Sequence, residues 1–292
     1  MGSINELVME FAYKLAREVN AKAILIYSEV AQDMTWKNDD PSYCEVMLIT
    51  RGKDTVPEKI QYVEKVINIP NVSLTRMSQV KLAITKGIST GYFESGDKIV
   101  CLTGVRKFGY VDSILIIDVG KEFEFLEPDE SFDMLADIYP EVFETVLNIS
   151  IELAAQGREG RSVGTMFILG DDEKVMQLSR QMIINPFKGY EEEKRNILDH
   201  TLKDTIKEFS ALDGAFVIRG DGVLLSAGRH LSAAFEGKDF PKGLGSRHIA
   251  AAGITSMTNS IAIVVSESSG TVRIFKNGKI FVDIEKAIEY EK

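Results

Sequence analysis

Hydrophobic and polar positions along the first 126 residues follow two spacings, one typical of helices and one typical of strands. Leu7, Phe11, Leu15 and Val19 recur at helical spacing, which predicts a helix over residues 6–19. The further predicted helices are 56–66 and 79–91, and the predicted strands are 23–27, 46–50, 72–75, 99–103 and 113–119. Because helix-length segments separate the strands, the pattern predicts an α/β domain, a parallel sheet flanked by helices.

The pattern of the second half predicts an α+β domain with a mixed central sheet surrounded by helices. The predicted helices are 141–156, 173–183, 197–209 and 247–257, and the predicted strands are 164–170, 215–219, 222–227, 260–266, 271–276 and 279–283. Gly220-Asp221 and Asn277-Gly278 each separate two strands in the manner of a tight hairpin turn. The acidic stretch 124–137 suits a linker, so we expect two domains, 1–126 and 127–292.

Composition narrows the class of protein. The chain has 292 residues, 45% of them hydrophobic and 27% charged, which suits two soluble domains with cores. Its net charge of −10 opposes general nucleic-acid binding, so any phosphate site must be local. No apolar run is long enough for a bilayer, and with no signal peptide recognised we expect a cytoplasmic protein without a membrane partner. Cys44 and Cys101 are predicted to be buried free thiols.

The loop GLGSRHIAAA, residues 243–252, carries the strongest candidate chemistry. It delivers Ser246, Arg247 and His248 to the start of a predicted helix. Unpaired N–H groups and the positive end of the dipole favour an anion there, and an arginine fork suits phosphate oxygens. His248 could donate to phosphate or transfer a proton. An ordinary helix capped by Ser246 remains an equal alternative from these residues alone.

Polar residues near two predicted strands could complete such a site. Asp213-Gly214-Ala215 puts a carboxylate before an apolar strand, where it could hold the divalent metal that accompanies polyphosphates. The glycine would let a ligand approach the backbone, although a turn aspartate capping local amides is an alternative. Ser266 and Glu267 lie at the end of another apolar strand. They could line a site there, or they could simply be the solvated end of the strand. Residues 157–164, GREGRSVG, lack the lysine-serine ending of a phosphate loop and are interpreted as a connection.

The N-terminal domain resembles the C-terminal domain of pyruvate kinase over about 100 residues. The resemblance rests on AKAILIYS at 21–28, on Lys86-Gly87 after a helical segment, and on 96–100 before a strand that ends at Thr103-Gly104. It implies a regulatory or assembly role for this domain.

The span from about Pro128 to the C-terminus resembles the diadenylate cyclase domain. Four motifs occur in the family's order, Asp213-Gly214-Ala215, then 245–249 (GSRHI), then Val265-Ser266-Glu267 and finally Asn277-Gly278. Together with the N-terminal domain, the arrangement looks like the archaeal type of these cyclases.

The resemblance implies condensation of two ATP molecules into cyclic di-AMP and two pyrophosphates, with Mn²⁺ or Mg²⁺ as cofactor. Asp213 would lie at the metal and the attacking ribose hydroxyl, with His248 as the second catalytic residue. Leu231 would pack on adenine. The full ATP-binding set implied is Gly214, Ala215, Leu231, Gly245, Ser246, Arg247, His248, Ser266 and Glu267. A homodimer is the minimum active unit, and a larger homo-oligomer is compatible with it.

Several positions depart from the bacterial pattern. Ile249 replaces a second arginine, and Ser268 replaces a second glutamate. Ser246 replaces a threonine conservatively, and Ser256 and Asn259 stand at acidic positions. These departures keep open an alternative function, a sensor that binds ATP or cyclic di-AMP without turnover. A third hypothesis is a structural scaffold in which the α/β domain carries the main role.

Overall fold

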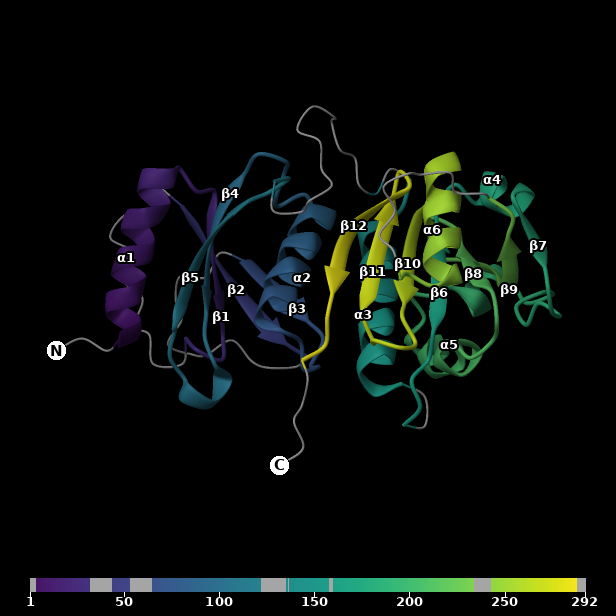
Figure 1. The fold of residues 1–292 in the computed structure, drawn as a ribbon, viewed down its shortest axis with the longest axis horizontal. Coiled ribbons are helices and arrows are strands. Elements are labelled where there is room, and N and C mark those ends of the chain that lie inside the picture. The colour runs from purple at the N-terminus through teal and green to yellow at the C-terminus, as the bar shows by residue number, and fades with distance from the viewer. Residues whose placement is uncertain are drawn as a thin grey trace. The chain divides into compact units, whose positions relative to one another are not determined.

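A computed structural model describes residues 4–31, 44–52, 65–121, 135, 137–157, 160–233 and 243–287 (Figure 1). The chain divides into two compact units, Met1–Asn71 with Gln79–Glu130, and Val72–Ser78 with Ser131–Lys292. Among the described residues, no helix combines the length and the apolar character needed to cross a membrane. The predicted linker 124–137 lies outside the described residues except at positions 135 and 137.

The first unit is built on a five-stranded sheet in the order β3-β2-β1-β4-β5. Its elements are α1 (Ile4–Val19), β1 (Ala23–Tyr27), β2 (Glu45–Arg51), β3 (Lys65–Ile69), α2 (Arg76–Ser89, from Gln79 on in this unit), β4 (Lys98–Thr103), the 3-10 turn η1 (Arg106–Phe108) and β5 (Ser113–Asp118). The pairings β3–β2, β2–β1 and β1–β4 are parallel, whereas β5 runs antiparallel to β4. The sheet is therefore mixed, not all parallel, because the short connection through η1 reverses the chain without a crossover helix.

One predicted strand and one predicted helix of this half need correction. Residues 72–75 form no regular strand and contribute only the isolated bridge of Leu74 with Lys286. Of the predicted helix 56–66, residues up to 64 lie outside the described residues, and its end lies in β3. Ile67 and Ile69 are buried, whereas Val66 is exposed, and this alternation between buried and exposed positions is typical of a strand.

The second unit has a seven-stranded sheet in the order β12-β11-β10-β6-β8-β9-β7. Its strands are β6 (Thr165–Leu169), β7 (Ser179–Gln181), β8 (Ala215–Ile218), β9 (Leu224–Leu231), β10 (Ile261–Val265), β11 (Val272–Lys276) and β12 (Lys279–Ile284). Only β6–β8 pair in parallel and the other neighbours are antiparallel, which confirms the predicted mixed sheet.

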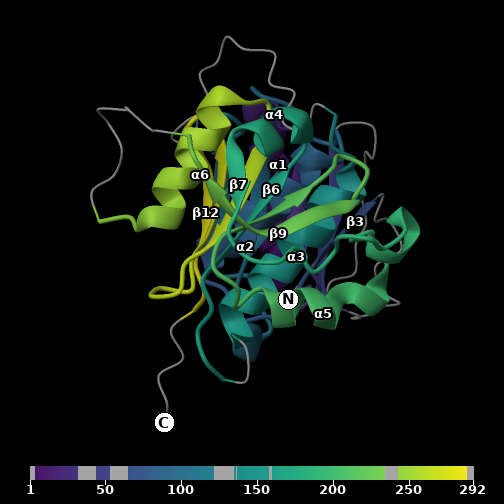
Figure 2. The ribbon, with the colours of Figure 1, turned by 90° about the vertical axis from the view of Figure 1, so that its right-hand side faces the viewer.

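Helices cover both faces of this second sheet. They are α3 (Pro140–Gln156), α4 (Asp172–Gln177), α5 (Lys203–Phe209) and α6 (Ser246–Met257), with the short turns η2 (Glu192–Arg195) and η3 (His200–Leu202). Figure 2 shows α6 and α3 on opposite faces. Ala251, Ala252 and Ile254 of α6 pack with Val264 and Phe275 in one buried cluster. This packing fixes α6 against the face of the sheet formed by β6, β10 and β11.

Two predicted helices of the second half are shorter than their periodicity indicates. The predicted helix 173–183 ends with α4, and Ser179–Gln181 form β7 instead. Arg229 of β9 helps to end the helix here, because its guanidinium donates to the carbonyls of Met176 and Ser179 at 3.0 and 2.8 Å and holds this segment against β9. The predicted helix 197–209 is likewise reduced to η3 and α5.

Local turn chemistry and cysteine burial follow the sequence closely. Asn277 and Gly278 have φ of 51° and 77° and join the antiparallel strands β11 and β12. The turn at Gly220-Asp221 joins β8 and β9, which are also antiparallel. Cys44 and Cys101 are both buried, and the described residues contain no disulfide.

Candidate active site

Arg247 is the point at which three distant segments meet. It lies in the first turn of α6, and its Nη2 is 3.6 Å from Oδ1 of Asp213. Its Nη1 is 3.7 Å from Oε2 of Glu267. Both carboxylates are largely exposed, with 77% and 63% of the side chain accessible. The guanidinium is therefore held loosely between two solvated carboxylates, and such exposed ion pairs contribute little to the free energy of unfolding.

The sheet register explains why these residues meet. Val265 at the end of β10 lies opposite Thr165 at the start of β6. Because β8 runs parallel to β6, with Phe216 opposite Phe167, the start of β8 lies at the same edge. Asp213 precedes β8 and Glu267 follows β10, so both carboxylates lie at this edge, where α6 begins.

The start of α6 differs in one respect from the sequence prediction. Gly245, not Ser246, is the N-cap residue, and it makes no side-chain cap hydrogen bond. The amides of His248 and Ile249 donate to the Gly245 carbonyl at 3.0 and 3.3 Å, so helical bonding begins one residue earlier. Ser246 is exposed as the first helical residue, which leaves its hydroxyl available for a ligand.

Two side-chain nitrogens in this first turn are buried without a hydrogen-bond partner among the described residues. They are Nε of Arg247 and Nδ1 of His248. His248 is only 5% exposed, and its Nε2 lies 3.2 Å from Nη1 of Arg273. Burial, followed by the nearby charges of Arg273 and Arg247, lowers the pKa of His248 to about 4. The imidazole is therefore neutral near pH 7, which suits a hydrogen-bond donor better than a proton carrier.

Gly164 belongs to this site, although the sequence analysis treats residues 157–164 as a connection. A Cβ at Gly164 would lie 2.8 Å from Nη1 of Arg247 and 2.9 Å from Cβ of Glu267. Only glycine lets the arginine lie this close to the chain. The sequence offers only one signal for this role, a glycine at the start of the predicted strand 164–170.

Gly214 and Leu231 both lie against other parts of this chain. Gly214 has φ of +99°, and a Cβ there would lie 2.8 Å from the backbone of Gly228 and Arg229. β9 therefore fills the space where a side chain at this position would lie, and the role of Gly214 in ligand binding stays a prediction. Leu231 is 6% exposed and lies in the cluster beneath α6, so this chain already covers its side chain. Ala215 is fully buried as the first residue of β8.

Ser266 shapes the turn after β10. It is 8% exposed, its amide donates to the Thr271 carbonyl at 2.9 Å, and its hydroxyl lies 3.4 Å from that of Ser268. Ser268, which departs from the bacterial motif, thus shares the turn. Ile249, the other departure, is 45% exposed and brings no charge to the start of α6.

Comparison with known proteins decides the family. Residues 152–280 match the family described as DisA bacterial checkpoint controller nucleotide-binding. A diadenylate cyclase of Methanocaldococcus jannaschii is 31% identical over 303 residues, which cover 97% of each chain. The chain belongs to the diadenylate cyclase family.

Further matches cover smaller parts of the chain. A diadenylate cyclase of Haloferax volcanii is 38% identical over 231 residues, 78% of this chain and 83% of the relative. One from Listeria monocytogenes is 40% identical over 74 residues, 25% of this chain. Residues 5–126 match the family described as probable sensor domain DacZ_P, and this match, not the resemblance to pyruvate kinase, describes the N-terminal half of this diadenylate cyclase family member.

The residues at this site fit a divalent metal only when a phosphate ligand is present. Within the described ranges, no group of three or more His, Cys, Asp or Glu side chains could hold a metal ion. Mg²⁺ is commonly bound by one or two carboxylates together with substrate phosphates and waters. The exposed carboxylate of Asp213 suits that mode, because the remaining ligands would come from triphosphate and solvent.

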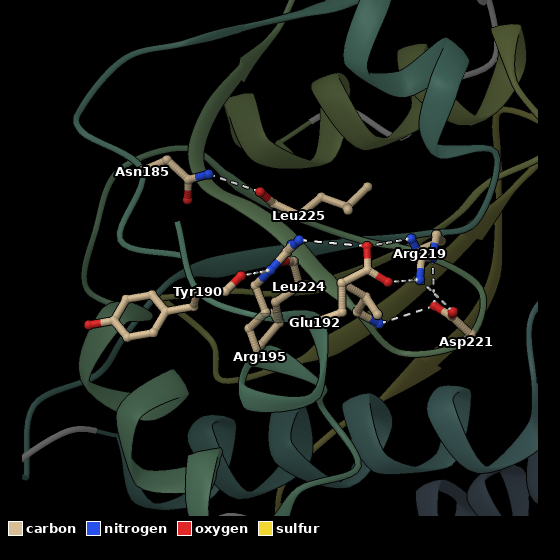
Figure 3. A network of polar contacts seen from close by, with 9 residues as sticks. Asn185, Tyr190, Glu192, Arg195, Arg219, Asp221, Leu224 and Leu225 are labelled. Carbon is tan, nitrogen blue, oxygen red and sulfur yellow. Dashed lines mark hydrogen bonds and ion pairs between the residues drawn. The ribbon is translucent and has the colours of Figure 1, made fainter. Parts of the chain in front are cut away.

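A second charged cluster lies at the other end of β8 and is structural (Figure 3). Arg219 follows β8, and its guanidinium donates to Glu192 at 3.0 and 2.6 Å and to Asp221 at 2.9 and 2.8 Å. The hydrogen bonds from Arg219 lower the pKa of Glu192. Arg195 donates to the carbonyls of Tyr190 and Leu224. These contacts fasten the η2 segment to the hairpin of β8 and β9, away from Asp213.

Proposed function

We propose that this chain condenses two ATP molecules into cyclic di-AMP and two pyrophosphates. The observation that carries the proposal is Arg247, held between Asp213 and Glu267 beside two buried nitrogens that have no hydrogen-bond partner among the described residues. Membership of the diadenylate cyclase family supplies the substrate class. The rival proposal is a sensor that binds ATP or cyclic di-AMP without turnover, which Ile249 and Ser268 motivate.

Each phosphodiester bond forms by nucleotidyl transfer. The 3′-hydroxyl oxygen of one ATP attacks the α-phosphorus of the other, and the bond between that phosphorus and the bridging oxygen to the β-phosphate breaks. Pyrophosphate leaves with that electron pair, and the hydroxyl proton passes to Asp213 or to solvent. The same exchange in the opposite direction closes the ring. Catalysis then depends on in-line positioning and on balancing charge on the phosphates.

The start of α6 is the proposed triphosphate site. Arg247 would exchange its two loose carboxylate contacts for phosphate oxygens, because charge-assisted paired bonds to phosphate are stronger. Ser246 and the first amides of the helix would donate to the same oxygens, and the helix dipole favours their charge. His248 would add its Nδ1–H. Gly245, Ser266 and Glu267 would shape the rim of this site.

Asp213 is the proposed metal-binding and hydroxyl-facing residue. Once phosphate binds Arg247, the Asp213 carboxylate loses its cationic neighbour and becomes available to hold Mn²⁺ or Mg²⁺. A bound metal would polarise a phosphoryl oxygen and help the 3′-hydroxyl lose its proton. Gly214 and Ala215 would hold the carboxylate at the strand edge, and Leu231 would support the floor on which adenine lies.

Two copies of the chain are needed if each presents one ATP. We therefore infer a homodimer as the minimum active unit, with a larger assembly open. In this proposal residues 127–292 form the catalytic domain, and residues 1–126 form a sensor or assembly domain of the archaeal type. We place the protein in the cytoplasm.

Turnover of the full chain tests this function directly. The protein is incubated with ATP and either Mn²⁺ or Mg²⁺, and products are separated by chromatography. We expect cyclic di-AMP and pyrophosphate in a ratio of one to two. Saturable ATP binding without cyclic di-AMP, across both metals and a range of protein concentrations, would favour the sensor.

Asp213→Asn separates the catalytic role of the carboxylate from its place in the fold. The variant keeps the size and local hydrogen bonding of the side chain but removes the negative charge. We expect product formation to fall by about a hundredfold or more, since charge at the reacting atoms is lost, with little change in melting temperature. Asp204→Asn, an exposed aspartate of α5, is the matched control and should retain activity. Full activity of Asp213→Asn would remove the role proposed for this residue.

A further inference from the structure

Arg273 contacts the one histidine of the proposed site from a separate strand. It lies on β11 opposite Val264 of β10, on the sheet face that α6 covers. Its Nη1 is 3.2 Å from Nε2 of His248. A guanidinium has five donors and no acceptor, so the bond runs from Arg273 to an unprotonated Nε2. None of the motifs in the sequence analysis includes this arginine.

That direction of donation determines the tautomer of His248. With Nε2 accepting, a neutral imidazole must carry its proton on Nδ1. Nδ1 is buried and has no partner within the part of the chain that the structure describes. Nε of Arg247, the preceding residue, is also buried without a hydrogen-bond partner among the described residues. Buried donors without partners are rare in folded proteins, and two in adjacent residues point to a missing acceptor.

Burial and, after it, the charges around His248 disfavour its cationic form. Arg247 precedes it on α6 and Arg273 faces it from β11, whereas the ring of Phe275, also on β11, is 6.1 Å away and carries no charge. Asp283 and Glu285 lie near Arg273 and favour its charged form, although burial acts more strongly in the other direction. Protonation at Nε2 would break the bond from Arg273 and add a third positive charge.

We propose that Arg273 is a positioning residue that holds His248 as a neutral Nδ1–H donor for a phosphate oxygen of the substrate. The proposal rests on the proposed function for its ligand, a nucleoside triphosphate. Phosphate oxygens would supply the acceptors that Nδ1 of His248 and Nε of Arg247 lack within the described ranges of the chain. Arg273 would not touch the substrate and would act through the imidazole.

The tautomer can be measured without any activity. The chain has three histidines, so ¹⁵N-histidine labelling gives few signals, and His248→Asn assigns the one of interest. We expect wild-type His248 to show a protonated Nδ1 and an unprotonated Nε2 from pH about 6 to about 8. Arg273→Met, which removes the donor, should give a mixture of tautomers, and Arg273→Lys should restore much of the Nδ1–H form. A wild-type Nε2–H tautomer or an imidazolium would overturn the proposal.

Kinetics then distinguish positioning from simple packing. Arg273→Met should raise the KM for ATP about tenfold with a smaller change in kcat, since a charge-assisted ground-state bond is weakened. Arg180→Met, an exposed arginine on β7, is the control and should leave both unchanged. His248→Asn should retain more affinity than His248→Gln, because the asparagine amide overlaps the Nδ1 position. An unchanged KM in an Arg273→Met variant with altered tautomer would refute the proposal.

Failure of the proposed function gives a different result. If the wild-type chain binds ATP but makes no cyclic di-AMP, the proposed reaction is refuted. The affinity for ATP, measured by calorimetry, then replaces KM in the comparison of wild type with the Arg273 variants. A loss of affinity in Arg273→Met that Arg273→Lys largely restores would then still support the role of Arg273. Equal affinities in wild type and Arg273→Met would overturn it.

Discussion

At the scale of the residue, the site is built from weak contacts that a phosphate can replace. Arg247 reaches Asp213 and Glu267 only at 3.6 and 3.7 Å, and both partners are exposed. Exposed ion pairs contribute about 0–1 kcal/mol, so giving them up costs little. His248 is the opposite case, since it is buried and held by Arg273. The site therefore combines one weakly paired cation with one buried neutral imidazole.

Gly164→Ala tests how closely Arg247 depends on its neighbour. The new methyl group would displace the guanidinium from a position 2.8 Å away, and it would also press on Cβ of Glu267 at 2.9 Å, which can move only together with its backbone. We expect kcat/KM to fall about tenfold, together with a lower melting temperature. Gly160→Ala is a contrasting control, because φ there is +75° but nothing lies within 4 Å of the new Cβ. It should lower stability and leave kcat/KM intact. Equal kcat/KM in Gly164→Ala and Gly160→Ala would contradict this account of Gly164.

His248 makes stability depend on pH in a definite direction. Its folded-state pKa of about 4 lies below its ordinary value of 6.5, so the unfolded chain binds more protons between these values. Stability from the neutral imidazole is present above pH 6.5 and is lost as pH falls through 4. Between pH about 7 and about 4.5, wild type should lose more stability than His248→Asn in urea unfolding. His230→Asn, at an exposed strand position, should follow the wild type.

At the scale of the element, the junction of α5 and β8 places Asp213. Gly214 has φ of +99° there, and the backbone of β9 leaves no space for a Cβ. The hairpin of β8 and β9 is fastened at its other end by Arg219, Glu192 and Asp221. Asp213 is thus positioned mainly by strand pairing and backbone conformation, and its carboxylate accepts a hydrogen bond from the amide of Gly214 at 3.1 Å.

Gly214→Ala should destabilise the second unit by about 2–4 kcal/mol, from strain at positive φ together with overlap with β9. Gly189→Ala isolates the first cause, since φ there is +94° and nothing lies within 4 Å of a new Cβ. Urea unfolding gives the free energy of unfolding of both variants. The extra loss of stability in Gly214→Ala is the effect of contact with β9. Equal losses of stability would mean that this contact does not constrain the junction.

At the scale of the whole molecule, the proposed reaction needs two chains. A mixed dimer of wild type with Asp213→Asn would hold two ATP molecules but only one Asp213 carboxylate. We expect such a dimer to form one phosphodiester bond and to release a linear dinucleotide. Excess Asp213→Asn added to wild type should therefore lower cyclic di-AMP more than adding Asp204→Asn does. A yield that follows the amount of wild-type chain alone would indicate that each chain completes both bonds unaided.

Local sequence signals determined much of the element content. The apolar run 23–27 forms β1 as predicted, and Asn277-Gly278 forms its hairpin turn, because both depend on neighbouring residues. The four motifs also indicated which residues to consider together, and the structure places Asp213, Arg247 and Glu267 at one edge. The catalytic and binding roles of these residues remain predictions.

Only the tertiary structure decided features that depend on a distant partner. Residues 179–181 continue a helical pattern but pair with β9, and β5 reverses beside β4. Gly164 and Arg273 carry no local motif, and each matters only through a side chain of α6 that the fold brings beside it. Periodicity reports which face of a segment is buried, whereas strand register and helix placement determine what lies against that face.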